Sequence, residues 1–430
     1  GWVQDSDVLD TWFSAGMWTF LTLGWPNEGA ADLQSYHPTT MLETGYDILP
    51  IWVVRMIFMS VYALGEVPFK YAYMHGLVRD DQGRKMSKSL DNIIDPLAMK
   101  AQFGTDATRL SLMMGNTPGN DTNLSEDKIA GYRNFTNKLW NVARFVLMSV
   151  DEIKLVDEQP EARTEADAWI LNKLNTVIAN VTEKLDEPKF EISGAGEELR
   201  GFTWGDFADW YLEVAKVQLE NDELKESTEE VLLYTLQSIL KMWHPFMPFV
   251  TTKLWESINP STMLLVEDWP VVTSSEGGKA FDRMKDIVTA IRATRAAYRV
   301  EPAKKIDAII TGSSLNELDD LKDVIMRLGR LENLEIVSDA KKPEGSVSEI
   351  AGGVTIYIPL EGMVDFDAER VRLTKELEGV SKYVFTVGKK LSNKGFTDNA
   401  PADAVEKERA KLKEATIREA ALNEQLEALG

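Results

Sequence analysis

"TTMLETGYDILPIWVVRMIFMSVYAL" occupies residues 39–64 and combines two patterns. Its first part ends in glycine and aspartate, as a buried strand does when it runs into a turn. Its second part, from residue 48, has apolar residues on most faces and predicts a buried helix. "KYAYMHGLV" (70–78) then has the aromatic and apolar composition of another strand. The order strand, helix, strand predicts a parallel sheet, and ligands of open parallel sheets collect beyond the carboxyl ends of the strands.

The carboxyl ends of these two predicted strands are "TGYD" (44–47) and "HGLVRDDQGRKMSKS" (75–89). The second contains Arg84, Lys85 and Lys88 within five positions. A mobile, glycine-flanked loop with lysine and arginine suits a polyphosphate, because it can close over negative charge that develops during phosphate chemistry. Charge alone leaves a second interpretation open, in which the three cations belong to an exposed loop without a ligand.

Residues 126–272 change character and consist of long amphipathic stretches separated by short polar turns. Their apolar residues recur at helical spacing, and four or five such helices make a bundle. "HPFMP" (244–248) interrupts the last stretch, because its two prolines lack amide donors. The predicted helices are 126–147, 167–185, 201–219 and 229–258.

Residues 273–362 mix both patterns and predict a small α/β domain, with helices at 280–300 and 315–331 and strands at 304–312 and 352–360.

Residues 363–430 carry a seven-residue apolar repeat, which predicts a coiled coil. The repeat breaks at 392–401 and resumes, so two helices of similar length should fold back as an antiparallel pair. Glu408 and Glu419 interrupt the second apolar seam. Residues 365–430 hold 13 acidic and 12 basic side chains, so this region is nearly neutral in a chain of net charge −22. The apolar positions are Phe366, Leu373, Val380, Val387, Leu377, Val384, Leu391, Val405, Leu412, Leu426, Ala415, Leu422 and Leu429.

Composition narrows the possible classes of protein. A chain of 430 residues suggests two to four domains. The absence of cysteine excludes disulfides and thiolate zinc sites, and it fits a reducing compartment. From the sequence, no apolar run is expected to approach the roughly 20 residues that cross a bilayer. The acidic field repels nucleic acid, so a nucleic-acid site would have to be a local basic patch.

The order Lys-Met-Ser-Lys-Ser at 85–89 resembles the second signature of class I aminoacyl-tRNA synthetases in every letter. "DVLDTWFSAGMW", "TGYDILPIWVVRMI", "MHGLVRDDQGRKMSKSLDNIIDP" and "GYRNFTNKLWNVARFVLM" together resemble the valyl-tRNA synthetase family. The terminal "KKLSNKGFTDNAPADAVEKERAKL" resembles the coiled-coil arm of that family. The arm argues against isoleucyl specificity.

The resemblance implies a multidomain fold that is mainly α with α/β parts. Residues 1–125 would form the carboxyl-terminal half of a Rossmann-like nucleotide-binding domain. Residues 126–272 would form a helical-bundle anticodon-binding domain, and residues 273–362 a small α/β domain. Residues 363–430 would form an antiparallel coiled-coil arm that binds tRNA.

The resemblance also implies a reaction and its site residues. Valine would attack the α-phosphorus of ATP, pyrophosphate would leave, and the valyl group would move to the 3′ end of tRNA(Val). Lys85 and Lys88 would stabilise the transition state and the leaving pyrophosphate. Magnesium would arrive with ATP, held mainly by phosphate oxygens and water, and no zinc is expected. The ATP-binding residues would be His75, Gly76, Met86, Ser87, Lys88 and Ser89, although His75 has a second interpretation as a packed residue at a strand end.

A small apolar pocket for valine would be formed by Trp12, Asp47, Ile48 and Trp52, although each tryptophan equally suits a plain core. The tRNA-binding candidates are Arg133 and Lys138 in the bundle and Lys382, Lys389, Lys390 and Lys394 near the tip of the arm. Aromatic residues of the bundle, such as Trp204, Trp210 and Tyr211, fit a core better than a base contact.

One departure from the family concerns its first signature, of His-Ile-Gly-His type. The three histidines are His37, His75 and His244, and none has a second histidine three residues away. The start "GWVQDSDVLDTWF" reads as the middle of a longer chain. We therefore expect a cytoplasmic, monomeric fragment that does not activate valine alone. The alternative is a stand-alone, non-catalytic tRNA-binding or assembly protein, which an intact KMSKS sequence disfavours.

Overall fold

The computed structural model describes residues 2–273, 277–360, 366–392 and 402–428 of the chain. These residues group into two compact units. The first unit contains residues 1–161, 173–212 and 222–275, and the second contains residues 162–172, 213–221 and 276–430. The two units are described separately below.

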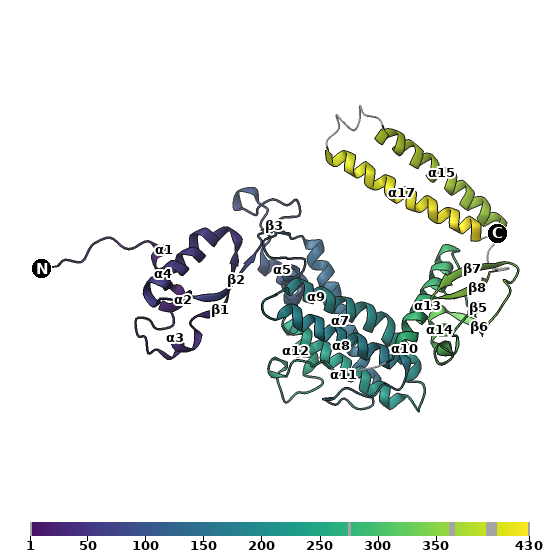
Figure 1. Ribbon diagram of the computed structural model, residues 1–430, viewed down its shortest axis with the longest axis horizontal. Helices are drawn as coiled ribbons and strands as arrows, with labels where there is room; N and C mark the ends of the chain where they lie inside the picture. The colour runs from purple at the N-terminus through teal and green to yellow at the C-terminus, as the bar shows by residue number, and fades with distance from the viewer. Residues whose placement is uncertain (1, 274–276, 361–365, 393–401, 429–430) are drawn as a thin grey trace. The chain divides into compact units, whose positions relative to one another are not determined.

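The first unit begins with a lobe built on two parallel strands, β1 (Thr39–Gly45) and β2 (Phe69–His75). Their connection is helical, consisting of η1 (Tyr46–Ile48), η2 (Leu49–Val53) and α4 (Val54–Leu64). The predicted order strand, helix, strand and the parallel pairing are therefore confirmed (Figure 1). The register places Gly45 opposite His75, so both carboxyl ends lie together. Three short helices complete the lobe: α1 (Thr11–Gly16), α2 (Trp18–Leu21) and α3 (Ala31–Tyr36).

The helical connection of this lobe corrects one expectation. Among the described residues, the continuous helical segment Tyr46–Leu64 is long and apolar enough to cross a membrane by length and composition. The cause is that η1, η2 and α4 run on without a break. Such a segment is weak evidence for a membrane span, because core helices meet the same criterion. Here Val53 and Met56 are buried against Leu42 and Phe69 of the two strands.

A second small sheet joins β3 (Val78–Arg79) to β4 (Thr122–Asn123) in parallel. Between these strands lie η3 (Lys88–Leu90), α5 (Pro96–Phe103) and α6 (Thr105–Met113). The chain enters β3 through Gly76, which passes very close to another backbone segment. A Cβ atom at this position would lie 1.6 Å from the carbonyl oxygen of Asn120, so no larger residue fits.

The rest of the first unit is helical, and α7 (Glu126–Ser149) lies at its centre. It packs against α6 and against three later helices, η4 (Phe202–Tyr211), α11 (Lys225–Trp243) and α12 (Pro248–Trp255). These contacts surround the buried rings of Phe135 and Trp243, which lie 5.0 Å apart. The interruption predicted at residues 244–248 is confirmed, because α11 ends at Trp243 and α12 begins at Pro248. The helices that follow α7 are α8 (Glu165–Leu185), α9 (Ile192–Gly201), η4 (Phe202–Tyr211), α10 (Leu212–Gln218), α11 (Lys225–Trp243), α12 (Pro248–Trp255) and η5 (Leu264–Val266). Of these, residues 165–172 of α8 and 213–218 of α10 belong to the second unit.

The second unit contains a four-stranded sheet in the order β6-β5-β8-β7. Its central strands β5 (Ile306–Gly312) and β8 (Val354–Pro359) confirm the two predicted strands. The sequence analysis missed the outer strands, β6 (Leu331–Val337) and β7 (Ser346–Ala351). β6 pairs with β5 in parallel, whereas the other pairings are antiparallel. The helices of this part are α13 (Lys279–Ala297), η6 (Asn316–Leu321) and α14 (Lys322–Gly329).

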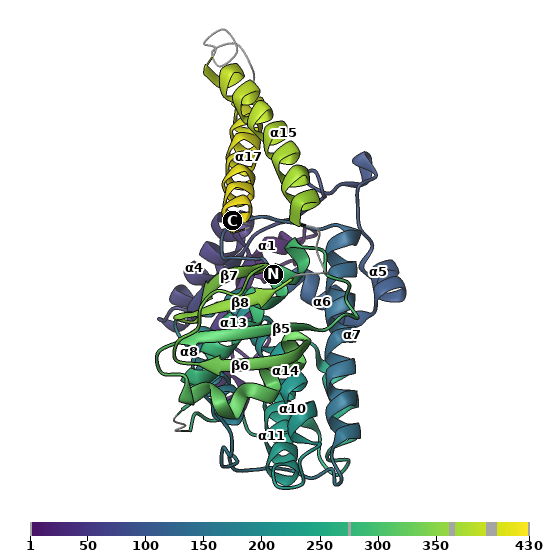
Figure 2. The same ribbon diagram turned by 90° about the vertical axis from the view of Figure 1, so that its right-hand side faces the viewer.

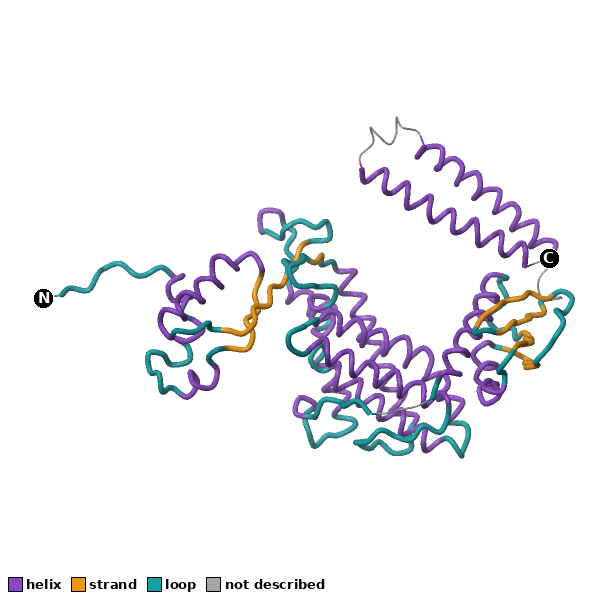
Figure 3. Tube along the Cα trace, viewed as in Figure 1, coloured by secondary structure: helices purple, strands orange, loops and turns teal. Residues whose placement is uncertain are grey.

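The chain ends in two long helices, α15 (Phe366–Ser392) and α17 (Ala402–Ala428), which lie side by side (Figures 2 and 3). Their contacts run in opposite directions, because Glu376 meets Arg418 at 2.6 Å and Lys390 meets Glu408 at 3.3 Å. The helices are therefore antiparallel, with five predicted seam positions buried. Those positions are Leu373, Val387, Val405, Ala415 and Leu422. The side chain of Phe366 and all of Leu429 lie outside the described residues.

Candidate functional site

The cationic loop follows β3 and is closed at its base by a tight turn. The amide of Gly83 donates to the carbonyl of Asp80 at 3.0 Å, and the amide of Asp80 donates to the carbonyl of Arg84 at 3.0 Å. Gly83 has a φ of 76°, which favours glycine. An isolated bridge then pairs Arg79 with Lys85. Residues 79–85 thus form a small hairpin that precedes the Lys-Met-Ser-Lys-Ser segment.

The carboxylate of Asp80 lies at the centre of this loop, and its side chain is only 6% exposed. It accepts hydrogen bonds from the Arg84 amide at 2.7 Å, from Arg84 Nε at 2.8 Å and from Asn92 Nδ2 at 2.9 Å. The Asn92 bond and the Arg84 contacts lower the pKa of Asp80 to about 2. Asp80 is therefore ionised at neutral pH and neutralises Arg84.

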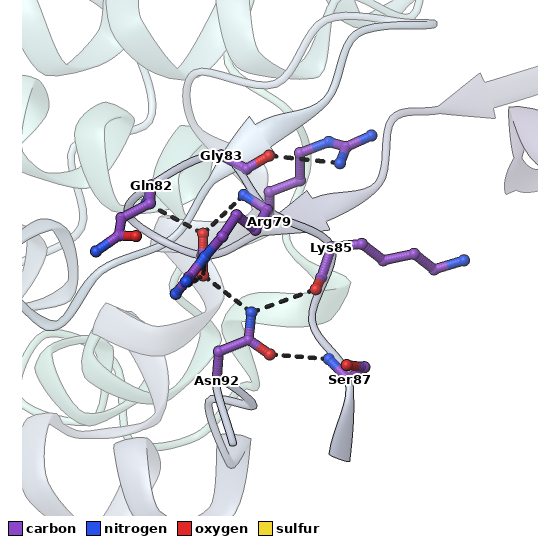
Figure 4. A network of polar contacts seen from close by, with 8 residues as sticks. Arg79, Gln82, Gly83, Lys85, Ser87 and Asn92 are labelled. Atoms are coloured by element: carbon purple, nitrogen blue, oxygen red, sulfur yellow. Dashed lines mark hydrogen bonds and ion pairs between the residues drawn. The ribbon is translucent and has the colours of Figure 1, made fainter. Parts of the chain in front are cut away.

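Asn92 links both sides of the loop (Figure 4). Besides Asp80, its amide nitrogen reaches the carbonyl of Lys85 at 3.2 Å, and its amide oxygen accepts from the Ser87 amide at 2.9 Å. The hydroxyls of Ser87 and Ser89 lie 3.1 Å apart. The sequence suggested a mobile loop, and these contacts were not predicted from it. An Asp-x-x-Gly turn at residues 80–83 was the available signal, because aspartate side chains accept nearby amides in turns.

The cations of the loop have different surroundings. Arg84 is paired with Asp80, whereas Lys85 is exposed and its side chain extends away from the polar network in Figure 4. Met86 packs against the buried cluster that contains Met99 and Leu124. The side chain of Lys88 lies outside the described ones.

His75 lies where the two strands of the first lobe end. Its Nδ1 is 2.8 Å from the carbonyl of Gly76, and its Nε2 is 3.3 Å from a carboxylate oxygen of Glu43. A Cβ atom on Gly45 would be 3.5 Å from His75 and 2.8 Å from Asp47, so these side chains flank the same glycine. The structure thus brings together His75 and Asp47, which the sequence analysis assigned to ATP and to valine.

Trp52 lines a pocket of about 350 Å³, together with Trp18, Leu42 and Phe69. The indole nitrogen of Trp52 donates to the carbonyl of Ala15 at 3.1 Å, which fixes the ring. The other three predicted pocket residues are not among those that line it. Trp12 instead lies under the guanidinium of Arg55, 5.3 Å from its ring. Asp47 is exposed and Ile48 half-buried just past the end of β1.

Trp18 was missed by the sequence analysis, although its ring lies 6.0 Å from that of Trp52. The signal was the second tryptophan of the quoted stretch "DTWFSAGMW" (10–18).

The predicted tRNA-binding residues are dispersed over two elements. In the bundle, Lys138 pairs with Asp209 at 3.0 Å and lies over the ring of Trp204, while Arg133 lies over the ring of Phe103. In the arm, Lys382 and Lys389 are exposed, whereas Lys390 pairs with Glu408. Lys394 lies outside the described residues. Throughout the described ranges, no three His, Cys, Asp or Glu side chains form a group that could hold a metal ion.

Three family models match consecutive parts of the chain. The model "tRNA synthetases class I (I, L, M and V)" matches residues 1–125, and "Anticodon-binding domain of tRNA ligase" matches residues 167–310. "Valyl tRNA synthetase tRNA binding arm" matches residues 365–430. The valine–tRNA ligase of Enterococcus faecalis is 42% identical over 439 residues, which cover 100% of this chain and 50% of the relative. The chain belongs to the valyl-tRNA synthetase family.

Other members of the valyl-tRNA synthetase family cover nearly the same share of this chain. The valine–tRNA ligases of Bacillus cereus and Geobacter sulfurreducens are 42% and 40% identical over 99% of this chain and 49% of their own length. The chain thus spans about half the length of the curated relatives it matches. The fold also resembles that of LeuRS from Agrobacterium radiobacter K84, solved as a ternary complex with tRNA and LeuAMS. That likeness has a TM-score of 0.50 and 18% identity, and it covers 78% of this chain and 42% of the other.

The resemblance to this family, stated from the sequence, is confirmed, and so is a mainly helical class I fold with some sheets. The roles of individual site residues and the four domain boundaries stay predictions.

Proposed function

We propose that this chain is the part of a valine–tRNA ligase that carries the phosphate-binding loop and the tRNA-binding surfaces. The observation that carries the proposal is the position of Lys-Met-Ser-Lys-Ser, which lies on the loop after β3 and begins ten residues past the carboxyl end of β2. In open parallel sheets, that end is where ligands bind. The valine–tRNA ligases that match the whole chain support the same role.

In the proposed reaction, a carboxylate oxygen of valine forms a bond to the α-phosphorus of ATP. The bond from that phosphorus to the oxygen bridging the α- and β-phosphates breaks, and pyrophosphate leaves. Magnesium that arrives with ATP would offset part of the charge on the phosphate oxygens. A ribose hydroxyl at the 3′ end of tRNA(Val) then attacks the valyl carbonyl and releases AMP. Negative charge grows on the departing phosphates, so the ammonium groups of Lys85 and Lys88 act where the charge develops. A lysine that binds this charge more tightly than ground-state ATP accelerates the reaction.

The remaining ATP-binding proposals concern residues around the loop. His75 ends β2 and Gly76 follows it, at the place where adenosine would lie. Ser87 and Ser89 present neighbouring hydroxyls that can donate to phosphate oxygens. Met86 holds the loop to the underlying core through its side chain.

Valine selection is proposed to involve the pocket beside Trp52, because rigid rings limit the volume of a bound side chain. Such an apolar wall discriminates one methylene by only roughly 1–3 kcal/mol and rejects the isosteric threonine poorly. Trp18 joins Trp52 in this proposal because both line the pocket. A cytoplasmic location and a monomeric state remain part of the proposal.

Pyrophosphate exchange tests the proposal. This chain alone is expected to give no detectable valine-dependent exchange between ATP and pyrophosphate, because its 430 residues hold no His-Ile-Gly-His signature. A polypeptide that joins this chain to the remaining half of the Enterococcus faecalis relative should restore exchange. Robust exchange by the chain alone would show that it holds a complete active site, and the proposal would be refuted on this point.

Within the active joined polypeptide, Lys85→Ala should lower the exchange rate by about a hundredfold, as the loss of one charge-stabilising group does. Lys100→Ala is the matched control, because Lys100 is exposed on α5 and lies outside the Lys-Met-Ser-Lys-Ser segment. If tRNA binds but Lys85→Ala exchanges as fast as the control, the non-catalytic RNA-binding alternative is favoured.

A further inference from the structure

Two residues at the base of the loop have no part in the reaction as proposed. Asp80 and Asn92 belong to the loop but lie outside Lys-Met-Ser-Lys-Ser. Their side chains nevertheless form one connected network with the backbone of residues 82–87. A buried carboxylate would be costly without partners, and Asp80 has three: Arg84, Asn92 and the amide of Gln82 at 3.1 Å.

We propose that Asp80 and Asn92 act as positioning residues, a loop clamp that sets the path of residues 84–87 and thereby presents Lys85 to a polyphosphate. This inference rests on the proposed function for the identity of the ligand. The arrangement of the loop itself rests only on the contacts described above.

The contacts of Asn92 fix three consecutive residues. Lys85 is held through its carbonyl, Ser87 through its amide, and Met86 between them through its packing on the cluster with Met99. The amide group of Asn92 has one orientation that satisfies these partners, because the carboxylate and the carbonyl both need a donor while the Ser87 amide needs an acceptor. No aspartate or apolar residue of similar size supplies both functions.

The clamp also gives Arg84 a different role from the lysines of the loop. Arg84 donates to Asp80 through its backbone amide and its guanidinium, so its positive charge is neutralised within the loop. Arg84 therefore belongs to the scaffold of the loop, and the charge available to an anion comes from the lysines of the signature. Charge alone did not distinguish Arg84 from the two lysines, which only the family resemblance had singled out.

Trypsin cleavage of the full chain tests the clamp, because the loop offers cleavage sites after Arg84, Lys85 and Lys88. Asn92→Ala and Asp80→Asn should raise the cleavage rate at these sites by about tenfold, since opening follows the loss of hydrogen bonds to a charged group. Asp91→Asn is the matched control: it removes the same charge from a neighbouring exposed residue and should leave the rate unchanged. Equal rates for Asn92→Ala, the control and the unmodified chain would overturn the clamp.

A pH profile separates positioning from a general loss of structure. Asn92→Asp replaces both donors with a second carboxylate facing Asp80, so the loop should open at pH 7. Two adjacent carboxylates share a proton at lower pH, which restores a donor. Amide hydrogen exchange of residues 84–92 should therefore be faster than in the unmodified chain at pH 7 and return toward it at about pH 5. Protection equal to the unmodified chain at both pH values would contradict the proposal.

Inorganic pyrophosphate distinguishes failure of the clamp from failure of the proposed function. Pyrophosphate should slow cleavage of the unmodified loop and protect Asn92→Ala less. Absence of protection in the unmodified chain would count against the polyphosphate ligand, whereas cleavage rates without pyrophosphate still decide the clamp. If Asp80→Asn lowers the unfolding temperature of the whole chain, its cleavage rate no longer reports on the loop alone. The clamp is then judged from Asn92→Ala and Asn92→Asp.

Discussion

The carboxyl group of Asp80 links the sequence of the loop to a measurable pH dependence. Its pKa is lowered to about 2, first by the hydrogen bond from Asn92 and then by Arg84. The ordinary value is about 3.9. Because the folded pKa is the lower one, the stabilisation is fully present above about pH 4 and is lost as the pH falls through about 2.

We expect the side-chain carboxyl carbon of Asp80 to titrate near pH 2 in an NMR experiment. Asn92→Ala removes the largest contribution and should raise this pKa toward the ordinary value. A midpoint that is the same with and without Asn92 would show that the hydrogen bond does not stabilise the ionised form.

The proposed role of Lys88 in stabilising the transition state can be tested by substitution. In the active joined polypeptide, Lys88→Ala should lower kcat for pyrophosphate exchange by about a hundredfold and leave the KM for ATP within about twofold, because the charge it meets develops only in the transition state. Steady-state kinetics at varied ATP concentration measure both quantities. A larger change in KM than in kcat would assign Lys88 to ground-state binding instead.

The sequence predicted the chemical type of the loop but not the roles of all its members. Lys85 and Lys88 follow from the signature, whereas the pairing of Arg84 with Asp80 depends on a turn that brings residues four apart together. Gly76 was predicted to be one of the ATP-binding residues. In the structure, glycine is needed at this position because the backbone of Asn120 passes too close for a side chain. Asn120 lies 44 positions away, so the local sequence around Gly76 does not reveal this contact.

At the scale of elements, periodic patterns predicted best. Spacing predicted the two helices of the terminal pair and, in the bundle, α7, α8 and α11, whereas α9 was missed. Strand β6 was missed because its first residue, Leu331, ends a stretch whose apolar spacing is helical. Strand β7 was missed because it is an edge strand with mixed polarity, "SVSEIA", and its pairing with β8 is a long-range property.

The seam between α15 and α17 contains a polar contact that can be tested. Glu419 accepts a hydrogen bond from the hydroxyl of Ser381 across the seam, which satisfies the carboxylate predicted to interrupt the heptads. Glu419→Leu should stabilise the helix pair by about 1 kcal/mol, because a half-buried polar group is exchanged for apolar surface. Hydrogen exchange of α15 and α17 in the full chain at increasing urea measures this change.

Glu378→Leu is the matched control, since Glu378 is exposed on α15 and should change stability by no more than about 0.5 kcal/mol. A loss of protection in Glu419→Leu would mean that the polar contact holds the register of the two helices.

At the scale of the whole molecule, charge is distributed unevenly. The chain carries a net charge of −22, yet residues 365–430 are nearly neutral, with 13 acidic and 12 basic side chains. An acidic protein that binds RNA needs such a region, because the phosphate backbone is repelled elsewhere. The sequence predicted this asymmetry, but it did not predict which lysines are already neutralised. Lys390 is paired with Glu408, whereas Lys382 and Lys389 are exposed.

This difference leads to a prediction about tRNA binding by the full chain. Each phosphate contact contributes a slope of about −0.7 to −0.9 to the dependence of log K on log salt. Lys382→Ala and Lys389→Ala should therefore each weaken binding of tRNA(Val) severalfold at low salt and make the slope shallower by about one. Lys390→Ala should change the slope less, because its charge is offset by Glu408 in the free protein. Filter binding across a salt series measures both quantities. Slopes that are identical in all three variants and in the unmodified chain would remove the arm from the RNA-binding surface, whereas an equal change in all three would mean that Glu408 releases Lys390 on binding.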